Sequence, residues 1–189
     1  MVNNLDKKAP FFVVSGPSGS GKTTICREIA NEFGWYFSIS HTTRAQRKNE
    51  RDGYDYYFVD EASFKEMMSR GEFLEWAQVY GNFYGTSKKI IEQKLSEGCG
   101  VILDVDTQGA ANIKKLMPQA VLIFIKTKTL DDLKMRLEKR GRDATEDISR
   151  RLKNAQTEMS HTGEYDHVIC NDELIAALTE MRKIIANHS

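Results

Sequence analysis

Residues 11–23 of this 189-residue chain read FFVVSGPSGSGKT and indicate its fold class. The apolar residues at 11–14 predict a buried strand, and residues 16–23 match the pattern G-x-x-x-x-G-K-[ST] at every fixed position. Residues 22–33 then carry apolar side chains at four-residue spacing, which predicts a helix. Because glycines let backbone N–H groups surround an anion without Cβ clashes, this strand, turn and helix predict a phosphate-binding loop.

The phosphate-binding loop assigns roles to particular side chains. Lys22 can bring its positive charge to the β- and γ-phosphates of a nucleotide, and the hydroxyl of Thr23 can ligate Mg²⁺. The loop leaves the reaction open, because GTPases, ATPases and small-molecule kinases all use it. We expect the nucleotide to contact Gly16, Pro17, Ser18, Gly19, Ser20, Gly21, Lys22, Thr23 and Thr24.

The charges of the chain balance, with 27 Lys plus Arg against 27 Asp plus Glu. A dedicated nucleic-acid binder usually has a strong basic excess, so we expect no nucleic-acid partner. The apolar runs are too short to span a bilayer, and the N-terminus lacks the basic-then-apolar plan of a signal peptide. The three cysteines are widely spaced and form no disulfide or zinc pattern. A cytoplasmic setting without a membrane partner is therefore expected.

Short apolar runs alternate with amphipathic stretches along the rest of the chain. We expect strands at 11–14, 35–39, 101–105, 121–125 and 167–170, and helices at 22–33, 87–97, 130–139, 146–160 and 173–187. Strands that alternate with helices predict a parallel sheet covered on both faces, which is an α/β fold. Residues 40–86 break the alternation with glycines, tyrosines and charges, and we interpret them as an inserted lobe with its own small sheet.

Asp104 and Asp106 lie at the end of the strand expected at 101–105. Parallel strands present their C-terminal ends to the ligand crevice, so a carboxylate there can hold Mg²⁺ directly or through water. The period-2 spacing of the two aspartates places both on one face of an extended strand. The alternative is a strand-to-loop transition in which an aspartate only caps the next element.

An ordered series of short motifs runs through the inserted lobe and the strand after it. The first motif carries Arg44 and Arg47, which can converge on one anion, although a solvated charged loop is the alternative from these residues alone. The motifs are S-x-T-T-R-x-x-R at 40–47, G-x-D-Y-x-F-V at 53–59, F-x-E-W-A at 73–77, G-x-x-Y-G-T at 81–86 and L-D-V-D-x-Q-G at 103–109. Together with the phosphate-binding loop, this series resembles the guanylate kinases, the bacterial forms most closely, along nearly the whole chain.

The resemblance implies a P-loop nucleoside monophosphate kinase fold and an enzyme that transfers the γ-phosphoryl group of ATP to GMP. The products would be ADP and GDP, within purine nucleotide metabolism, and Mg²⁺ bound with ATP would be the cofactor. ATP and GMP would be the small-molecule partners, while the oligomeric state stays open between a monomer and a homo-oligomer. The implied parts are a P-loop core at 8–39, 87–135 and 152–189, a GMP-binding lobe with a small mixed β-sheet at 40–86, and a helical lid at 136–151.

The resemblance also implies the residues of the GMP site. Guanine presents N1–H and an exocyclic NH₂ as neighbouring donors, which suit an ionised carboxylate, and by similarity Glu75 is that carboxylate. The hydroxyls of Ser40 and Thr86 would add contacts at the O6 and N7 side, with Thr86 standing where many relatives have Ser. Arginine forks and tyrosine hydroxyls would hold the phosphate. The implied GMP-binding residues are Ser40, Arg44, Arg47, Tyr56, Glu75, Tyr84, Thr86, Asp104 and Asp106.

The pattern L-x-x-R-L-E-x-R-G at 133–141 resembles the lid that closes over ATP in these kinases. The alternative for this charged region is an ordinary salt-bridged helical surface. Asn171 resembles a position near the adenine ring, and Asp104 would reach Mg²⁺ through water while Thr23 ligates it beside the nucleotide. The implied catalytic residues are Lys22, Arg44, Arg136, Arg140 and Arg151.

Two other functions stay open at this point. One is a kinase for another phosphorylated acceptor on the same scaffold, for which Glu75 is the discriminating residue. The other is a non-catalytic interaction module, since guanylate-kinase-like domains also occur as scaffolds. Such modules often lose the phosphate-loop lysine or the lid arginines, whereas Lys22, Arg136 and Arg140 are all present in this chain.

Overall fold

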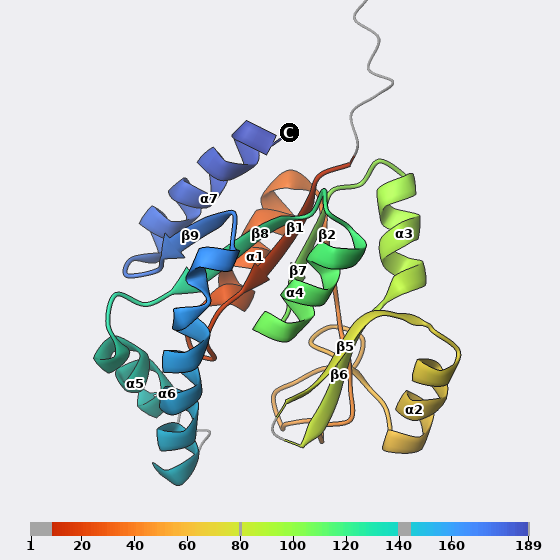
Figure 1. Ribbon diagram of the computed structural model, residues 1–189, viewed down its shortest axis with the longest axis horizontal. Helices are drawn as coiled ribbons and strands as arrows, with labels where there is room; N and C mark the ends of the chain where they lie inside the picture. The colour runs from red at the N-terminus through yellow and green to blue at the C-terminus, as the bar shows by residue number, and fades with distance from the viewer. Residues whose placement is uncertain (1–8, 80, 140–144, 189) are drawn as a thin grey trace, which may run out of the picture.

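The computed structural model describes residues 9–79, 81–139 and 145–188. Its core is a five-stranded, all-parallel sheet with the order β2-β7-β1-β8-β9 (Figure 1). The pairing of Val14 with Asp104 brings the loop after β1 next to the end of β7. The strands are β1 (Phe11–Ser15), β2 (Tyr36–Phe37), β7 (Val101–Asp104), β8 (Val121–Lys126) and β9 (His167–Cys170).

Helices cover both faces of the parallel sheet. Because successive strand residues point to opposite faces, Phe12 and Val14 pack with α1 (Lys22–Phe33) and α7 (Leu174–His188). Val13 and Leu103 point the other way, into a second cluster with side chains of α3 and α4. This burial on both faces explains why the strands read as continuous apolar runs. The helices of the second face are α3 (Lys88–Ser96) and α4 (Thr107–Leu116).

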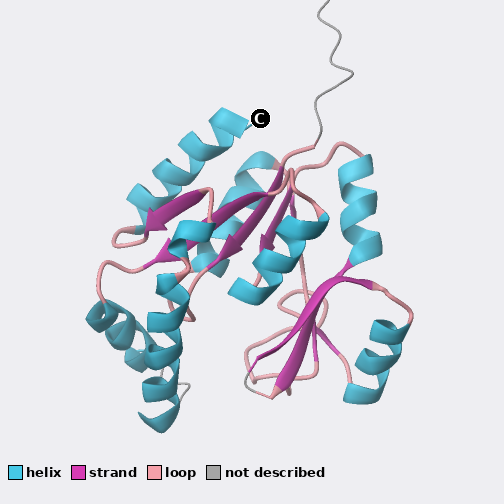
Figure 2. Cartoon of the chain, in the orientation of Figure 1, coloured by secondary structure: helices cyan, strands magenta, loops and turns pink. Residues whose placement is uncertain are grey.

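A second, mixed sheet of four strands lies beside the core, with the order β4-β3-β6-β5 (Figure 2). Helix α2 (Glu61–Ser69) packs on it through the fully buried Phe64, whose ring stacks on Phe73 at 4.5 Å and on Phe83 at 5.4 Å between centroids. The small sheet and α2 therefore share an aromatic cluster that is separate from the two clusters of the parallel sheet. The strands are β3 (His41–Thr42), β4 (Tyr57–Phe58), β5 (Phe73–Val79) and β6 (Asn82–Ser87).

Two further helices, α5 (Leu130–Lys139) and α6 (Thr145–Ser160), pack against each other between β8 and β9 in the chain (Figure 1). Leu133 and Leu137 of α5 meet Ile148 and Ala155 of α6 in a small buried cluster. A 3₁₀ turn, η1 (Thr162–Glu164), leads from α6 into β9. The long helix α6 thus extends from the region after α5 back to the core sheet.

The predicted fold class is confirmed, with a parallel core flanked by helices and a small mixed sheet. The helices expected at 22–33 and 130–139 have those bounds. Helices α2 and α4 were not predicted from the pattern. The expectation that Asp104 and Asp106 share a strand face is wrong, because β7 ends at Asp104 and Asp106 is the N-cap of α4.

Candidate active site

The loop between β1 and α1 is shaped by glycines. Gly16 has φ 134°, and a Cβ there would lie 2.0 Å from the carbonyl oxygen of Ile125 in β8. Gly21, with φ 94°, is the N-cap of α1, and the first turn of that helix contains no acidic side chain. The unpaired N–H groups and the positive end of the helix dipole therefore stay uncompensated by the helix itself, which favours an anion.

Two side chains follow the loop directly. The Lys22 Nζ donates to the carbonyl oxygens of Gly16 at 2.7 Å and Pro17 at 3.1 Å, so its charge lies over the loop. The Thr23 Oγ1 donates to Asp104 Oδ2 at 2.6 Å, which joins α1 to the end of β7. These two oxygens suit a hard cation such as Mg²⁺, whose other ligands would be phosphate and water. No group of three His, Cys, Asp or Glu side chains suited to a metal occurs among the residues described.

A chain of hydrogen bonds supports the loop from the side of α5 and β9. Arg136 donates to the carbonyl oxygens of Asn171 at 2.7 Å and Asp172 at 3.1 Å. The buried side-chain amide of Asn171 donates in turn to the carbonyl oxygen of Ser20 at 2.6 Å. A cavity of about 240 Å³ opens beside these contacts, lined by Gly19, Gly21, Arg136 and Lys139.

The other expected lid arginines lie in different situations. Arg151 of α6 donates through Nη1 to the hydroxyl of Ser18 in the glycine loop at 2.7 Å. This contact brings a lid-region side chain onto the loop that would hold phosphate. Arg140 lies outside the described residues. The role of Asn171 near adenine stays a prediction, since its side-chain amide donates to the Ser20 carbonyl oxygen.

Glu75 lies on β5 of the small sheet and is only 7% exposed. It accepts a 2.6 Å hydrogen bond from the fully buried Thr86 hydroxyl on the neighbouring strand. Its other oxygen fits against Gly109 of α4, where a Cβ would lie 2.7 Å from Glu75 Oε2 and 3.1 Å from Asp106 Oδ1. Asp106 itself accepts the Gly109 N–H at 2.7 Å. The glycine thus lets two carboxylates from the lobe and the core lie close to each other.

This arrangement changes the proton affinity of Glu75. Burial raises the pKa of Glu75 to about 7, the hydrogen bond from Thr86 opposes the rise, and the negative charge of Asp106 adds to it. Burial also raises the pKa of Asp106, against the hydrogen bond from Gly109. A buried carboxyl group that titrates near neutral pH is typical of functional sites.

The residues expected to bind the acceptor phosphate gather on the small sheet and the loop before β4. The guanidinium of Arg44 lies 5.3 Å from the Tyr56 ring centroid, and the Tyr56 and Tyr84 rings are 5.9 Å apart. Burial would lower the pKa of Arg44, but hydrogen bonds with Glu50 and Tyr84 raise it overall, so the guanidinium stays charged. Burial, followed by the charge of Asp104, raises the pKa of Tyr56 to about 12, which keeps its hydroxyl a neutral donor.

The remaining expected residues are less constrained by side-chain contacts. The side chain of Arg47 is 41% exposed. Ser40 directly precedes β3 and is partly buried, and its carbonyl oxygen accepts the Tyr57 N–H at 2.9 Å. The structure therefore brings Arg44, Tyr56 and Tyr84 together closely and leaves Arg47 at the surface of the same loop.

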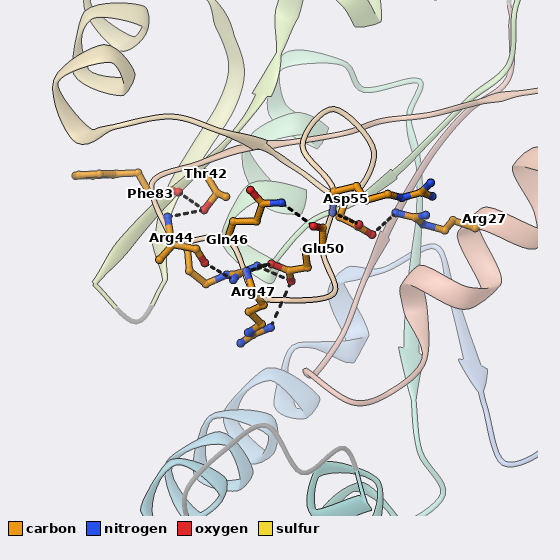
Figure 3. Close-up of polar contacts among 10 residues, drawn as sticks. Arg27, Thr42, Arg44, Gln46, Arg47, Glu50, Asp55 and Phe83 are labelled. Atoms are coloured by element: carbon orange, nitrogen blue, oxygen red, sulfur yellow. Dashed lines mark hydrogen bonds and ion pairs between the residues drawn. The ribbon is translucent and has the colours of Figure 1, made fainter.

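Three residues of this region were missed by the sequence reasoning. Glu50 binds both arginines of the loop, and Gly109 makes room for Glu75. Arg27 of α1 forms an ion pair at 3.0 Å with Asp55, in the loop before β4 (Figure 3). Arg27 also donates to the Tyr54 carbonyl oxygen at 3.0 Å. The available signal was the lone glutamate among the basic residues of 44–51. Nothing in the sequence indicates the partners of Gly109 and Arg27.

Comparison with known proteins identifies the family of the chain. The family model for guanylate kinase matches residues 8–188. The chain belongs to the guanylate kinase family. It is 48% identical to the guanylate kinase of Dechloromonas aromatica, over 93% of this chain and 87% of that protein, and 46% identical to that of Nitrosomonas europaea, over 93% and 88%.

Solved structures give the same result for the fold. A crystal structure of guanylate kinase from Anaplasma phagocytophilum superposes with a TM-score of 0.79 at 34% identity, over 96% of this chain and 86% of that one. The predicted family and the predicted class of enzyme, a kinase of the guanylate kinase family, are confirmed. No helix in the described part of the chain is both long and apolar enough to cross a membrane.

Proposed function

We propose that the protein transfers the γ-phosphoryl group of ATP to GMP, giving ADP and GDP. The observation that carries this proposal is the buried Glu75 carboxylate, paired with Thr86 in the lobe whose loop also holds Arg44. A buried carboxyl group needs partners that repay its desolvation. Two adjacent N–H donors on a flat base would provide them.

Guanine fits that requirement and adenine does not. Guanine offers N1–H and its exocyclic NH₂ side by side, and an ionised carboxylate accepts both. Adenine presents an acceptor at N1 and no amino group at C2, so a carboxylate repels it. A buried polar site left unpaired by the wrong base can discriminate by ~10⁴-fold. Ser40 and Thr86 would contribute hydroxyl contacts to the same base.

The acceptor phosphate would be bound by Arg44, Arg47, Tyr56 and Tyr84. The closeness of the Arg44 guanidinium to the Tyr56 ring, and of the Tyr56 and Tyr84 rings to each other, supports this grouping. Planar guanidiniums match phosphate oxygens with two parallel hydrogen bonds, and neutral tyrosine hydroxyls donate without adding charge. Asp104 and Asp106 would face the acceptor from the core.

For this reaction the protein would mainly have to align the two nucleotides and neutralise negative charge on the transferring phosphoryl group. A phosphate oxygen of GMP is already anionic near neutral pH, so the attack requires no general base. Lys22 and the arginines 136, 140 and 151 would neutralise charge on the transferring group while the glycine loop holds the β- and γ-phosphates. Mg²⁺, bound by Thr23 and by Asp104 through water, would supply further positive charge at those phosphates.

Exclusion of water is the second requirement, because water would otherwise accept the phosphoryl group. We infer that the lobe at 40–86 and the lid at 136–151 close over the core when both substrates are bound. The contact of Arg151 with Ser18 supports this role for the lid, because it joins α6 to the phosphate loop.

Direct product analysis tests the proposal. Purified protein, ATP, GMP and Mg²⁺ are incubated, and the nucleotides are separated by chromatography. We expect ADP and GDP to appear in equal amounts. ADP without GDP would indicate an ATPase, and no product at all would favour a non-catalytic interaction module.

A further inference from the structure

Glu50 is the acidic centre of the loop that carries Arg44 and Arg47, as Figure 3 shows. Its side chain is 12% exposed. The Arg44 Nη2 donates to both of its carboxylate oxygens, at 2.8 and 2.9 Å. The backbone N–H of Arg47 donates to Oε2 at 2.9 Å, and the Arg47 guanidinium lies 3.7 Å from Oε1. One carboxylate therefore contacts both arginines expected to bind the acceptor phosphate.

The position of Glu50 is fixed by its own turn. Its backbone N–H donates to the Arg47 carbonyl oxygen at 3.0 Å, and its carbonyl oxygen accepts the Gln46 side-chain amide at 2.6 Å. The carboxylate closes the turn from the other side by accepting the Arg47 N–H. Through these hydrogen bonds the Glu50 carboxylate helps to fix the backbone conformation of the loop. It differs from a surface counter-ion, which an incoming anion could displace without disturbing the backbone.

Arg44 is held on several sides in addition to Glu50. Its Nη1 donates to the Ala45 carbonyl oxygen at 2.8 Å, and its guanidinium lies 5.3 and 5.8 Å from the Tyr56 and Phe58 ring centroids. Its side chain is 15% exposed, against 41% for Arg47. Two guanidiniums on one short loop repel each other, and a carboxylate between them offsets that repulsion. Fixing long side chains in advance also lowers the entropy cost of binding.

We propose that Glu50 is a positioning residue of the acceptor site, which holds Arg44 and the Arg47 backbone so that both guanidiniums meet the phosphate of the acceptor nucleotide. This inference rests on the proposed function and deepens its account of the phosphate side of the site. It requires that Glu50 act on the phosphate alone. The purine base is expected against Glu75, which lies on β5, whereas Glu50 lies in the loop between β3 and β4.

The test compares a ligand that has the phosphate with one that lacks it. Binding of GMP and of guanosine is measured by calorimetry for the wild type, Glu50→Gln and Glu50→Asp. For Glu50→Gln we expect GMP affinity to fall ~10-fold or more, as for loss of a charge-assisted pair, while guanosine affinity does not change. Glu50→Asp keeps the charge on a shorter side chain and should recover part of the loss. In steady-state assays KM for GMP should rise while KM for ATP stays constant.

Glu61→Gln serves as the matched control. Glu61 lies on α2 of the same lobe, is exposed, and forms an ion pair with Lys65 at 2.6 Å. The substitution removes the same charge as Glu50→Gln, but from a salt bridge on α2 and not from the loop that carries Arg44 and Arg47. GMP affinity should therefore not change.

Two results would overturn the inference. Tighter GMP binding by Glu50→Gln would identify Glu50 as a competing anion, and equal losses for GMP and guanosine would identify a general structural role. A different result would refute the proposed function. A wild type that binds GMP but forms no GDP would refute phosphoryl transfer, while the comparison of GMP with guanosine would still decide the role of Glu50.

Discussion

The phosphate-binding loop at 16–23, the expected donor loop, and the lobe at 40–86, the expected acceptor lobe, present different parts of the chain to their expected ligands. Residues 16–23 are one contiguous stretch whose shape is set by glycine backbone, and Lys22 bonds to main-chain carbonyls of that stretch. The acceptor lobe gathers side chains from several segments, and these side chains contact one another: Glu75 with Thr86, and Arg44 with Glu50. Main-chain groups recognise any phosphate, whereas a set of side chains can select one nucleotide.

The difference has a thermodynamic side as well. The donor loop carries a cation whose hydrogen bonds run to carbonyl oxygens, an arrangement that needs no buried negative charge. The acceptor lobe buries a carboxyl group whose pKa is raised to about 7, which costs stability whenever that group is ionised. The carboxylate expected to select the base is therefore expected to lower the stability of the lobe. The donor loop contains no such buried charge and should have no such cost.

The largest effect is expected at the donor loop. Lys22→Met removes the charge proposed to neutralise the transferring phosphoryl group, and we predict a loss of ~10³-fold or more in kcat. GMP binding, measured by calorimetry, should be unchanged because Lys22 contacts the donor side. Lys183→Met, at an exposed position of α7, is the control and should keep full activity. A Lys22→Met protein with near-normal turnover would contradict the role given to this residue.

The next effect tests whether the acceptor pocket depends on side-chain packing. Gly109→Ala would place a Cβ 2.7 Å from Glu75 Oε2 and so displace the carboxylate. We predict that KM for GMP rises ~10- to 100-fold, consistent with a misplaced binding group. The helix itself should tolerate alanine, since alanine has the higher helix propensity. Gly163→Ala, where a Cβ would meet nothing within 4 Å, is the control. An unchanged KM in Gly109→Ala would mean that Glu75 is not in the base pocket.

The pH dependence of binding separates the base from the phosphate. Guanosine has no phosphate, so its affinity should follow the ionisation of Glu75, whose pKa is raised to about 7. We predict that affinity rises up to ~10-fold per pH unit below that value and levels off above it. Calorimetry between pH 5 and pH 8 (about the range in which Glu75 titrates) measures this. In Glu75→Gln the affinity should be weak and independent of pH, and a flat profile in the wild type would count against the assignment.

The smallest effect is a gain of stability in Glu75→Gln. The folded-state pKa of Glu75 lies above its unfolded value of 4.5, so the folded state holds the proton longer and stability falls as pH rises from 4.5 to about 7. Above that range the cost is constant. We predict that Glu75→Gln is more stable than the wild type by about 1–3 kcal/mol at pH 8. The difference should vanish at pH 4 (about where both states are protonated) in urea unfolding followed by circular dichroism. Destabilisation at pH 8 would show that the carboxylate stabilises the lobe.

The sequence predicted most where the signal is contiguous. The strand at 11–14 and the helix at 22–33 follow from local pattern, and both are present. The local pattern does not predict helix α4, because its residues 107–116 include Gly109, a poor helix former, and because Asp106 directly follows the run that predicts a strand. The Asp106 carboxylate accepts the Gly109 N–H, which is the capping alternative that the sequence left open. Contacts between distant segments, such as Glu75 with Gly109, could not be obtained from spacing alone.

The acceptor preference of the wild type tests directly whether Glu75 selects guanine. kcat/KM is measured for GMP, AMP, CMP and UMP at one saturating ATP concentration, with ADP formation coupled to NADH oxidation. The buried Glu75–Thr86 pair predicts that GMP exceeds each of the others by ~10⁴-fold, and that Glu75→Gln reduces this preference sharply. Comparable turnover of AMP and GMP by the wild type would show that Glu75 does not select guanine.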